Sequence, residues 1–233
     1  KLSHEAEAPA FLRVEKSVLG YRWADRLPAS DGNIALAVAQ THGIPEYLAR
    51  ILVARGTTLE SAVNDINPTL KALMPDPSAL KDMDRATQRF VKAVSGREPI
   101  AIFGDYDVDG ATSASLILRF VRAYGHDASI YIPDRQLEGY GPNNTAFEQL
   151  ISDGAKLIVT VDCGTASHEP VELANKLGAD VIVLDHHQAD ECVPPAYALV
   201  NPTHQDDLSG QSQLAPVGVV FAFPASAANR TGN

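Results

Sequence analysis

Three aspartates, at positions 105, 107 and 109, stand on alternate positions directly after the apolar run 100–103. Two carboxylates about 4 Å apart repel each other by roughly 4 kcal/mol at an effective dielectric near 20. Such a cluster at the end of a buried strand is costly unless cations neutralise it. The pattern therefore predicts a metal site that includes Asp105 and Asp107. Asp109 stands before Gly110 and is predicted to cap the next helix rather than to bind metal.

Two later apolar runs also end in groups that bind metals. Asp162 follows one of them, and Asp185, His186 and His187 follow the next. In an open parallel sheet, ligands bind at the carboxyl ends of the strands, so these residues are expected at one edge. Carboxylates mixed with imidazole suit Mn²⁺ or Mg²⁺, and several acids suggest two ions. Paired ions that share a carboxylate are the arrangement that hydrolyses phosphate esters.

A parallel sheet would bring these residues together. The apolar runs alternate with helical patterns, which is typical of an α/β fold with a mostly parallel sheet and flanking helices. The predicted strands cover residues 100–103, 129–132, 157–161, 181–184 and 198–200, and the predicted helices between them cover 112–124, 145–152 and 170–177. After the last strand, Pro224 is expected to interrupt the apolar helix that would follow Val220 and Phe221.

The chain divides into three predicted parts. Residues 1–32 contain prolines and little periodicity, which predicts an irregular extension. Residues 33–98 show helical periodicity interrupted by turn residues, which predicts a helical leader. Residues 99–233 form the predicted α/β domain.

Composition and charge restrict the function. The chain has 233 residues, of which 45% are hydrophobic, and a net charge of -10. Residues 100–233 hold 17 Asp and Glu against 6 Lys and Arg, which argues against a broad basic face for nucleic acid. We find no apolar run of about 18 residues and no secretory signal, so we expect no membrane partner and a cytoplasmic protein. Cys163 and Cys192 fit no disulfide framework and are expected to be free thiols.

Two other interpretations of the acidic loop are less consistent with the sequence. Its Asp-x-Asp-x-Asp-Gly pattern matches the start of an EF-hand, but Leu116 occupies the position that requires a bidentate Glu. The segment 107–110 also resembles the start of the haloacid-dehalogenase-like phosphatases, where the first acid is a nucleophile. That family uses a Lys and a later acidic pair that we cannot place here, and it gives no role to His186 and His187.

Taken together, three motifs resemble the first three motifs of the DHH phosphoesterases. They are Gly-Asp-Tyr-Asp-Val-Asp-Gly at 104–110, Val-Asp-Cys-Gly at 161–164 and Asp-His-His at 185–187. Further segments, among them 67–70, 131–135, 138–141 and 201–202, resemble the single-stranded-DNA-specific exonucleases within that family.

The resemblance implies a role for each matching residue. It implies that two divalent cations, Mn²⁺ or Mg²⁺, are bound by four residues: Asp105, Asp107, Asp162, which bridges the ions, and His186. It implies that Asp185 orients the imidazoles, that His187 contacts the scissile phosphate and that Arg135 binds phosphate.

The resemblance also implies a reaction and its partners. We expect hydrolysis of single-stranded DNA from the 5′ end in repair and recombination, with a single-strand-binding protein and a helicase as partners. The family's domain continues to a fourth metal-binding Asp and to DNA-binding domains, so we expect a truncated amino-terminal portion whose domain 99–233 is incomplete at its C-terminus. The alternatives are a non-catalytic fragment of that enzyme, or another DHH hydrolase that acts on short oligonucleotides or cyclic dinucleotides.

Overall fold

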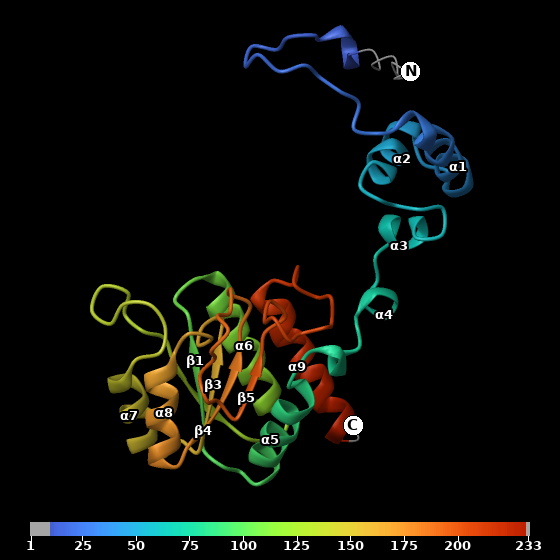
Figure 1. Ribbon diagram of the computed structural model, residues 1–233. Coiled ribbons are helices and arrows are strands. Elements are labelled where there is room, and N and C mark those ends of the chain that lie inside the picture. The colour runs from blue at the N-terminus through green and yellow to red at the C-terminus, as the bar shows by residue number, and fades with distance from the viewer. Residues whose placement is uncertain (1–9, 232–233) are drawn as a thin grey trace. The chain divides into compact units, whose positions relative to one another are not determined.

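The computed structural model describes residues 10–231. The chain divides into two compact units between Met74 and Pro75 (Figure 1). Residues 1–9 of the predicted extension, and residues 232–233, lie outside the described part. Among the described helices, none has the length and apolar character needed to cross a membrane.

The first unit is a small helical domain. Its core is formed by buried Ala, Val and Leu side chains, including Ala35, Val38 and Ala49. Between residues 14 and 28 the chain forms turns and bends without a helix or strand. The helical elements are η1 (Phe11–Arg13), η2 (Ala29–Asp31), α1 (Gly32–His42), α2 (Glu46–Val53), α3 (Ala62–Ile66) and α4 (Leu70–Leu73).

The second unit is built on a parallel sheet with the strand order β2-β1-β3-β4-β5. The five strands confirm the predicted α/β fold, and each lies within a residue of its predicted bounds. Because β2 lies on one side of β1 and β3 on the other, the topology switches between β1 and β3, where open sheets bind their ligands. The strands are β1 (Ile100–Gly104), β2 (Ala128–Tyr131), β3 (Leu157–Val161), β4 (Asp180–Leu184) and β5 (Ala198–Val200).

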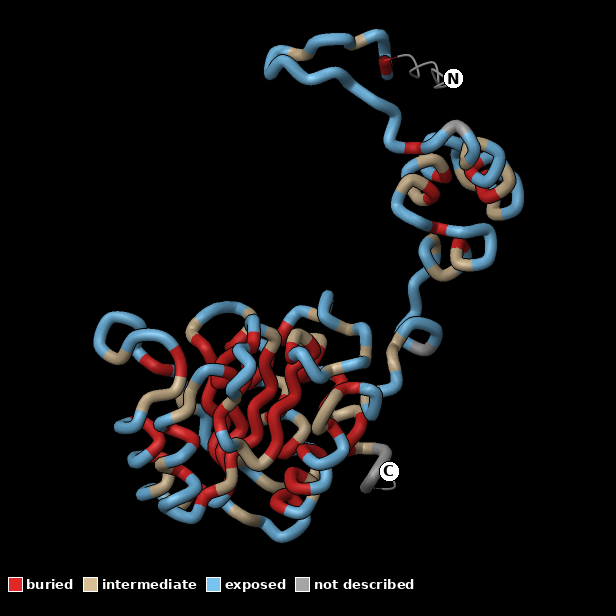
Figure 2. Tube along the Cα trace, in the orientation of Figure 1, coloured by how far each residue is buried: buried red, intermediate tan, exposed pale blue. Residues whose placement is uncertain are grey.

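Helices cover both faces of this sheet (Figure 1). Alternate residues of the strands point to opposite faces, so Ile102 and Val159 pack toward one group of helices, and Phe103 and Ile158 toward the other. Strands β1, β3, β4 and β5 are accordingly buried along most of their length, whereas the edge strand β2 is half-buried to exposed (Figure 2). One face carries α5 (Met83–Ser95), α6 (Val108–Ala123) and α9 (Pro216–Thr231), and the other carries α7 (Asn144–Ser152) and α8 (His168–Leu177); η3 (Pro77–Ala79) precedes α5.

The structure differs from two expectations. Helix α5 belongs to the sheet unit rather than to a separate leader, because Met83 and Phe90 are fully buried against the sheet core; the unit starts at Pro75 instead of residue 99. Helix α9 continues through Pro224, which was expected to interrupt it. Pro224 removes one helical hydrogen bond, but Phe223 and Ala227 on either side of it are fully buried, and their packing keeps the next turn helical.

Candidate metal centre

The loop after β1 places Asp105 and Asp107 differently from Asp109. The Asp107 carboxylate caps α6 by accepting hydrogen bonds from the N–H groups of Asp109 (2.9 Å) and Gly110 (3.0 Å). The prediction that Asp109 caps this helix is therefore wrong, because Asp107 provides the cap. The helix begins at Val108, four residues before its predicted start, because Asp107 provides the cap. These two N–H groups, with Gly110 contributing most, lower the pKa of Asp107.

Gly110 allows the start of α6 to lie against the backbone of Asp105. A Cβ atom at residue 110 would lie 2.3 Å from the carbonyl oxygen of Asp105, a distance that real side chains do not reach. The glycine therefore lets the loop close tightly, with Asp105 and Asp107 on the same side.

Asp162 is the buried acid at the tip of β3. Its φ of 60° is in the left-handed region, which is uncommon outside glycine and is tolerated best by Asn and Asp. Burial, followed by the repulsion of Asp107, raises the pKa of Asp162 to about 7. Ligand atoms of Asp105, Asp107 and Asp162 all lie within 4.8 Å of one another, which is close enough to hold one cation.

The tip of β4 adds two imidazoles to this group. His186 Nε2 lies 3.7 Å from Asp162 Oδ1. Ligand atoms of Asp162, His186 and His187 also lie within 4.8 Å of one another. Asp162 is thus common to both ligand groups.

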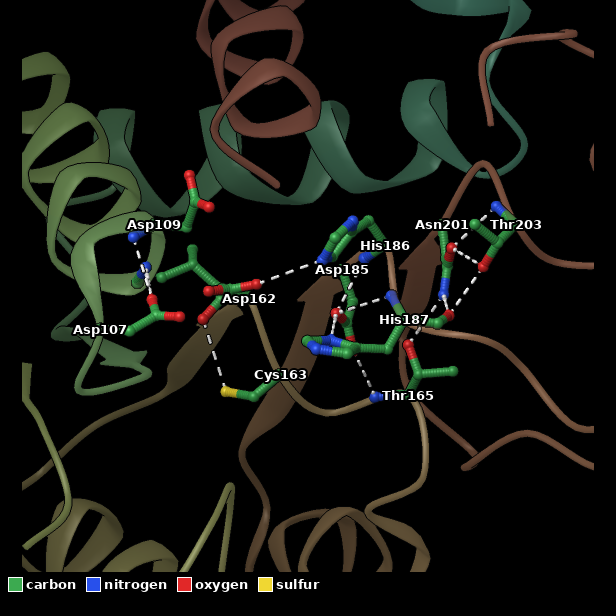
Figure 3. A network of polar contacts seen from close by, with 12 residues as sticks. Asp107, Asp109, Asp162, Cys163, Thr165, Asp185, His186, His187, Asn201 and Thr203 are labelled. Atoms are coloured by element: carbon green, nitrogen blue, oxygen red, sulfur yellow. Dashed lines mark hydrogen bonds and ion pairs between the residues drawn. The ribbon is translucent and has the colours of Figure 1, made fainter. Parts of the chain in front are cut away.

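Asp185 organises the loop that carries both histidines (Figure 3). Its Oδ1 accepts hydrogen bonds from His187 Nδ1 at 2.7 Å and from the His186 N–H at 2.8 Å, and its Oδ2 accepts from the Thr165 N–H at 3.0 Å. Burial opposes the ionised form of Asp185, but these hydrogen bonds outweigh it and lower the pKa to about 2. The same hydrogen bond from His187 to Asp185 raises the pKa of His187.

Asn201, at the tip of β5, supports this loop through hydrogen bonds. It is fully buried, and its Nδ2 donates to His187 O at 2.8 Å and to Thr165 Oγ1 at 3.0 Å. Thr203 Oγ1 donates to the same carbonyl of His187 at 2.7 Å (Figure 3). The position of His187 is therefore fixed through both its side chain and its backbone.

Arg135 lies in the exposed loop after β2, outside both ligand groups. Its guanidinium carbon is 5.2 Å from the centre of the Tyr106 ring, the distance of a cation–π contact. In the same loop, the hydroxyl of Tyr140 is 3.3 Å from Asp162 O and 3.3 Å from His187 Nε2.

The structure thus brings together the predicted ligands Asp105, Asp107, Asp162 and His186, with Asp185 and His187 beside them. No sequence pattern indicated a role for Asn201 or Tyr140. Asn201 directly follows the last strand, and Tyr140 lies between two glycines. These positions become informative only when the fold places both residues beside His187.

The donor set fits divalent cations. Asp105 Oδ1 is buried and has no hydrogen-bond partner among the described residues, an arrangement that is costly unless a ligand completes it. Burial raises the pKa of Asp105, as it does that of Asp162. Buried carboxylates with one unsatisfied oxygen and a neighbouring imidazole match the preference of Mn²⁺ or Mg²⁺.

Comparisons with solved structures give the same fold. A structure of the exonuclease RecJ bound to manganese has a TM-score of 0.60 and 31% identity, over 66% of this chain and 39% of that one. RecJ from Thermus thermophilus in complex with Mn²⁺ has a TM-score of 0.71 and 26% identity, over 88% of this chain and 28% of that one.

Sequence comparisons give relatives and a family. The single-stranded-DNA-specific exonuclease RecJ of Bacillus subtilis is 38% identical over 200 residues, which are 86% of this chain and 25% of that protein. The RecJ protein of Escherichia coli is 35% identical over 179 residues, 76% of this chain and 30% of that protein. The chain thus spans less than a third of the length of either relative. Residues 99–231 match the model of the DHH family, N-terminal domain, and the chain belongs to the DHH family.

Proposed function

We propose that this chain contributes the metal-binding domain of a divalent-metal-dependent exonuclease that hydrolyses single-stranded DNA from its 5′ end. The observation that carries this proposal is the position of Asp162 in two ligand groups at the switch point of the sheet. The similarity to RecJ proteins supports the choice of single-stranded DNA as the substrate.

The ligand groups divide the residues between two cations. Asp105 and Asp107 would hold one cation, His186 the other, and Asp162 both. Two divalent cations at such a site supply Lewis acidity toward a phosphodiester. Asp107 would serve at the same time as the helix cap, because both N–H groups bind one oxygen and the other oxygen could bind metal.

His187 is better suited to contact the phosphate than to bind metal. Its Nδ1 is engaged by Asp185 at 2.7 Å, and its raised pKa favours the protonated imidazole, which cannot bind a cation. Held by Asp185, the imidazolium can donate Nε2–H to a phosphate oxygen and can stabilise charge that develops there.

We propose that Arg135 binds the phosphate that is adjacent, in the DNA strand, to the reacting phosphate. The charge of the chain supports this role, because residues 100–233 contain 6 Lys and Arg in all. The planar guanidinium suits phosphate oxygens, and Tyr106 supports it from one side at 5.2 Å. The proposed setting is the cytoplasm, with a single-strand-binding protein and a helicase as partners that present the strand.

The first test is the stoichiometry of Mn²⁺ binding, measured by isothermal titration calorimetry. We expect two sites in the chain, loss of one site in His186→Ala and loss of both in Asp162→Asn. Unchanged binding in Asp162→Asn would contradict the shared ligand.

The second test is substrate choice. With Mn²⁺ present, a 5′-phosphorylated single-stranded oligonucleotide should be shortened from its 5′ end, and His187→Gln should slow this at least about 100-fold, as expected when a positioned proton donor is removed. Faster hydrolysis of dinucleotides or cyclic dinucleotides than of long strands would point to a different DHH hydrolase.

A further inference from the structure

A pocket of about 720 Å³ lies directly beside the proposed metal ligands. It is lined by Tyr140 from the loop after β2, by Gly164 and Thr165 from the segment between β3 and α8, by His168 at the start of α8, and by His187 and Gln188 from the loop after β4. Its volume falls within the range of about 300–1,000 Å³ that small-molecule sites occupy. Because His187 lines it, a ligand in this pocket would be continuous with a phosphate at the metal centre.

The charge of the pocket disfavours a second phosphate. Among the residues that line it, none is Lys or Arg, whereas Glu169 and Asp185 are acids. Pro142, Pro170 and Ala166 add apolar surface to the lining. The pocket is thus better suited to a neutral ligand with flat apolar faces.

Tyr140 offers a flat face to such a ligand. Its side chain is 55% exposed, although its hydroxyl lies 3.3 Å from His187 Nε2. Glu138 fixes the loop by accepting a hydrogen bond from the Tyr131 hydroxyl at 2.6 Å and another from the Asp134 N–H at 2.8 Å. Tyr140 is therefore held at its hydroxyl end and meets Tyr106 and His187 in edge-to-face contacts, while more than half of its surface remains accessible. An accessible aromatic ring is the usual platform for a nucleobase.

The rim of the pocket carries polar side chains that are free to bind a ligand. Asn144, His168 and Gln188 line it and make no side-chain hydrogen bond to any described residue. The amides of Asn144 and Gln188 each offer a donor and an acceptor, so they can pair with the edge of any nucleobase. Such a site binds a base without requiring a particular sequence.

We propose that this pocket binds the nucleoside attached to the phosphate at the metal centre, with its base stacked on Tyr140. This inference rests on the proposed function, because it takes the phosphate to lie between the metal ligands and His187. It names the part of the substrate that the domain recognises, and it assigns Tyr140 as a substrate-binding residue rather than a support for His187.

The test compares two probes that differ in the base. Affinities of the chain for thymidine 5′-monophosphate and 2-deoxyribose 5-phosphate are measured by calorimetry, with Mn²⁺ and again in EDTA. In both conditions we expect the nucleotide to bind at least about fivefold more tightly than 2-deoxyribose 5-phosphate. This factor is the lower end of the gain in affinity that one base–aromatic stack provides. Tyr140→Ala should abolish the difference, and Tyr140→Phe and Tyr140→Trp should retain it.

Two further variants control for indirect effects. Ala166→Phe adds a ring at an exposed position that lines the pocket, so it should also abolish the difference without removing a buried contact. Leu137→Ala removes an 86% exposed side chain of the same loop outside the pocket and should change nothing.

The outcomes separate this inference from the proposed function. Equal affinity for the two probes in a chain that binds Mn²⁺ would overturn the pocket assignment alone. A Tyr140→Phe variant that behaves like Tyr140→Ala would also overturn it, because the hydroxyl contact with His187 would then be the role of Tyr140. A chain that fails to bind Mn²⁺ but discriminates the probes in EDTA would contradict the metal centre and support the pocket.

Discussion

Replacing Asp162 by Asn removes the charge at the centre of the site while keeping the shape of the side chain. Asn is among the residues that best tolerate the left-handed φ of 60° at this position. The protonated carboxyl of Asp162 donates a hydrogen bond to Asp107, and the amide of Asn can replace it as the donor. We expect the variant to be more stable than the wild type without metal, and to lose the stabilisation that Mn²⁺ confers on the wild type.

The pKa of Asp162 gives the size of the effect. It is raised from an ordinary value of 3.8 to about 7, mainly by burial. Between these two pH values the folded chain holds the proton that the unfolded chain has released, so the free energy of unfolding falls as the pH rises through this window. At about 1.36 kcal/mol per pKa unit the ceiling is about 4 kcal/mol at pH 8, and relaxation of the surroundings reduces the expected gain to about 1–3 kcal/mol.

Thermal unfolding followed by circular dichroism measures this gain. In EDTA at pH 8, Asp162→Asn should melt at least about 2 °C above the wild type, since 1 kcal/mol corresponds to about 2–4 °C in a chain of this size. The difference should shrink at pH 5, where the wild-type carboxyl is protonated. Mn²⁺ should raise the melting temperature of the wild type at pH 8 and leave that of the variant unchanged.

Asp109→Asn is the matched control, because it removes an acid from the same region whose carboxylate makes no hydrogen bond to a described residue and belongs to neither ligand group. It should leave both the stability and the response to Mn²⁺ unchanged. The reasoning is refuted if Asp162→Asn is less stable than the wild type in EDTA at pH 8, or if Mn²⁺ stabilises it as strongly as the wild type.

Three other substitutions test the support of the site. Asn201→Ala removes the donor to His187 O and should lower the free energy of unfolding by about 1–3 kcal/mol and weaken Mn²⁺ binding, as measured by chemical denaturation and calorimetry; full Mn²⁺ affinity would argue against its positioning role. Asp185→Asn should lower the pKa of His187 in an NMR titration, because it removes the carboxylate that favours the imidazolium, and an unchanged pKa would contradict this. Gly110→Ala should destabilise the chain by about 1–3 kcal/mol in thermal unfolding, because its Cβ would lie 2.3 Å from Asp105 O; a melting temperature equal to that of the wild type would contradict the close approach.

The sheet was predictable from sequence because its signal is local. Strands β1, β3, β4 and β5 are short, mostly apolar runs, and burial on both faces requires such runs whatever the rest of the chain does. The strand tips were predictable for the same reason, since Asp105, Asp162 and Asp185 each follow directly after a run. Where several residues compete for one backbone role, local pattern was insufficient: Asp107 and Asp109 both precede Gly110, and the hydrogen-bond geometry selects Asp107.

Packing decided the features that the sequence left open or indicated wrongly. Pro224 is a strong local signal against a helix, yet Phe223 lies 4.9 Å from Phe90 between ring centres and helps to keep α9 in place. Asn201 shows the converse case, because no local pattern reveals that a buried amide at the end of β5 reaches His187 O at 2.8 Å. The proposed ligands are therefore readable from sequence because each lies in a loop directly after a strand. The residues that support the site are not readable from sequence, because each contacts a residue that is distant in the chain and close only in the fold.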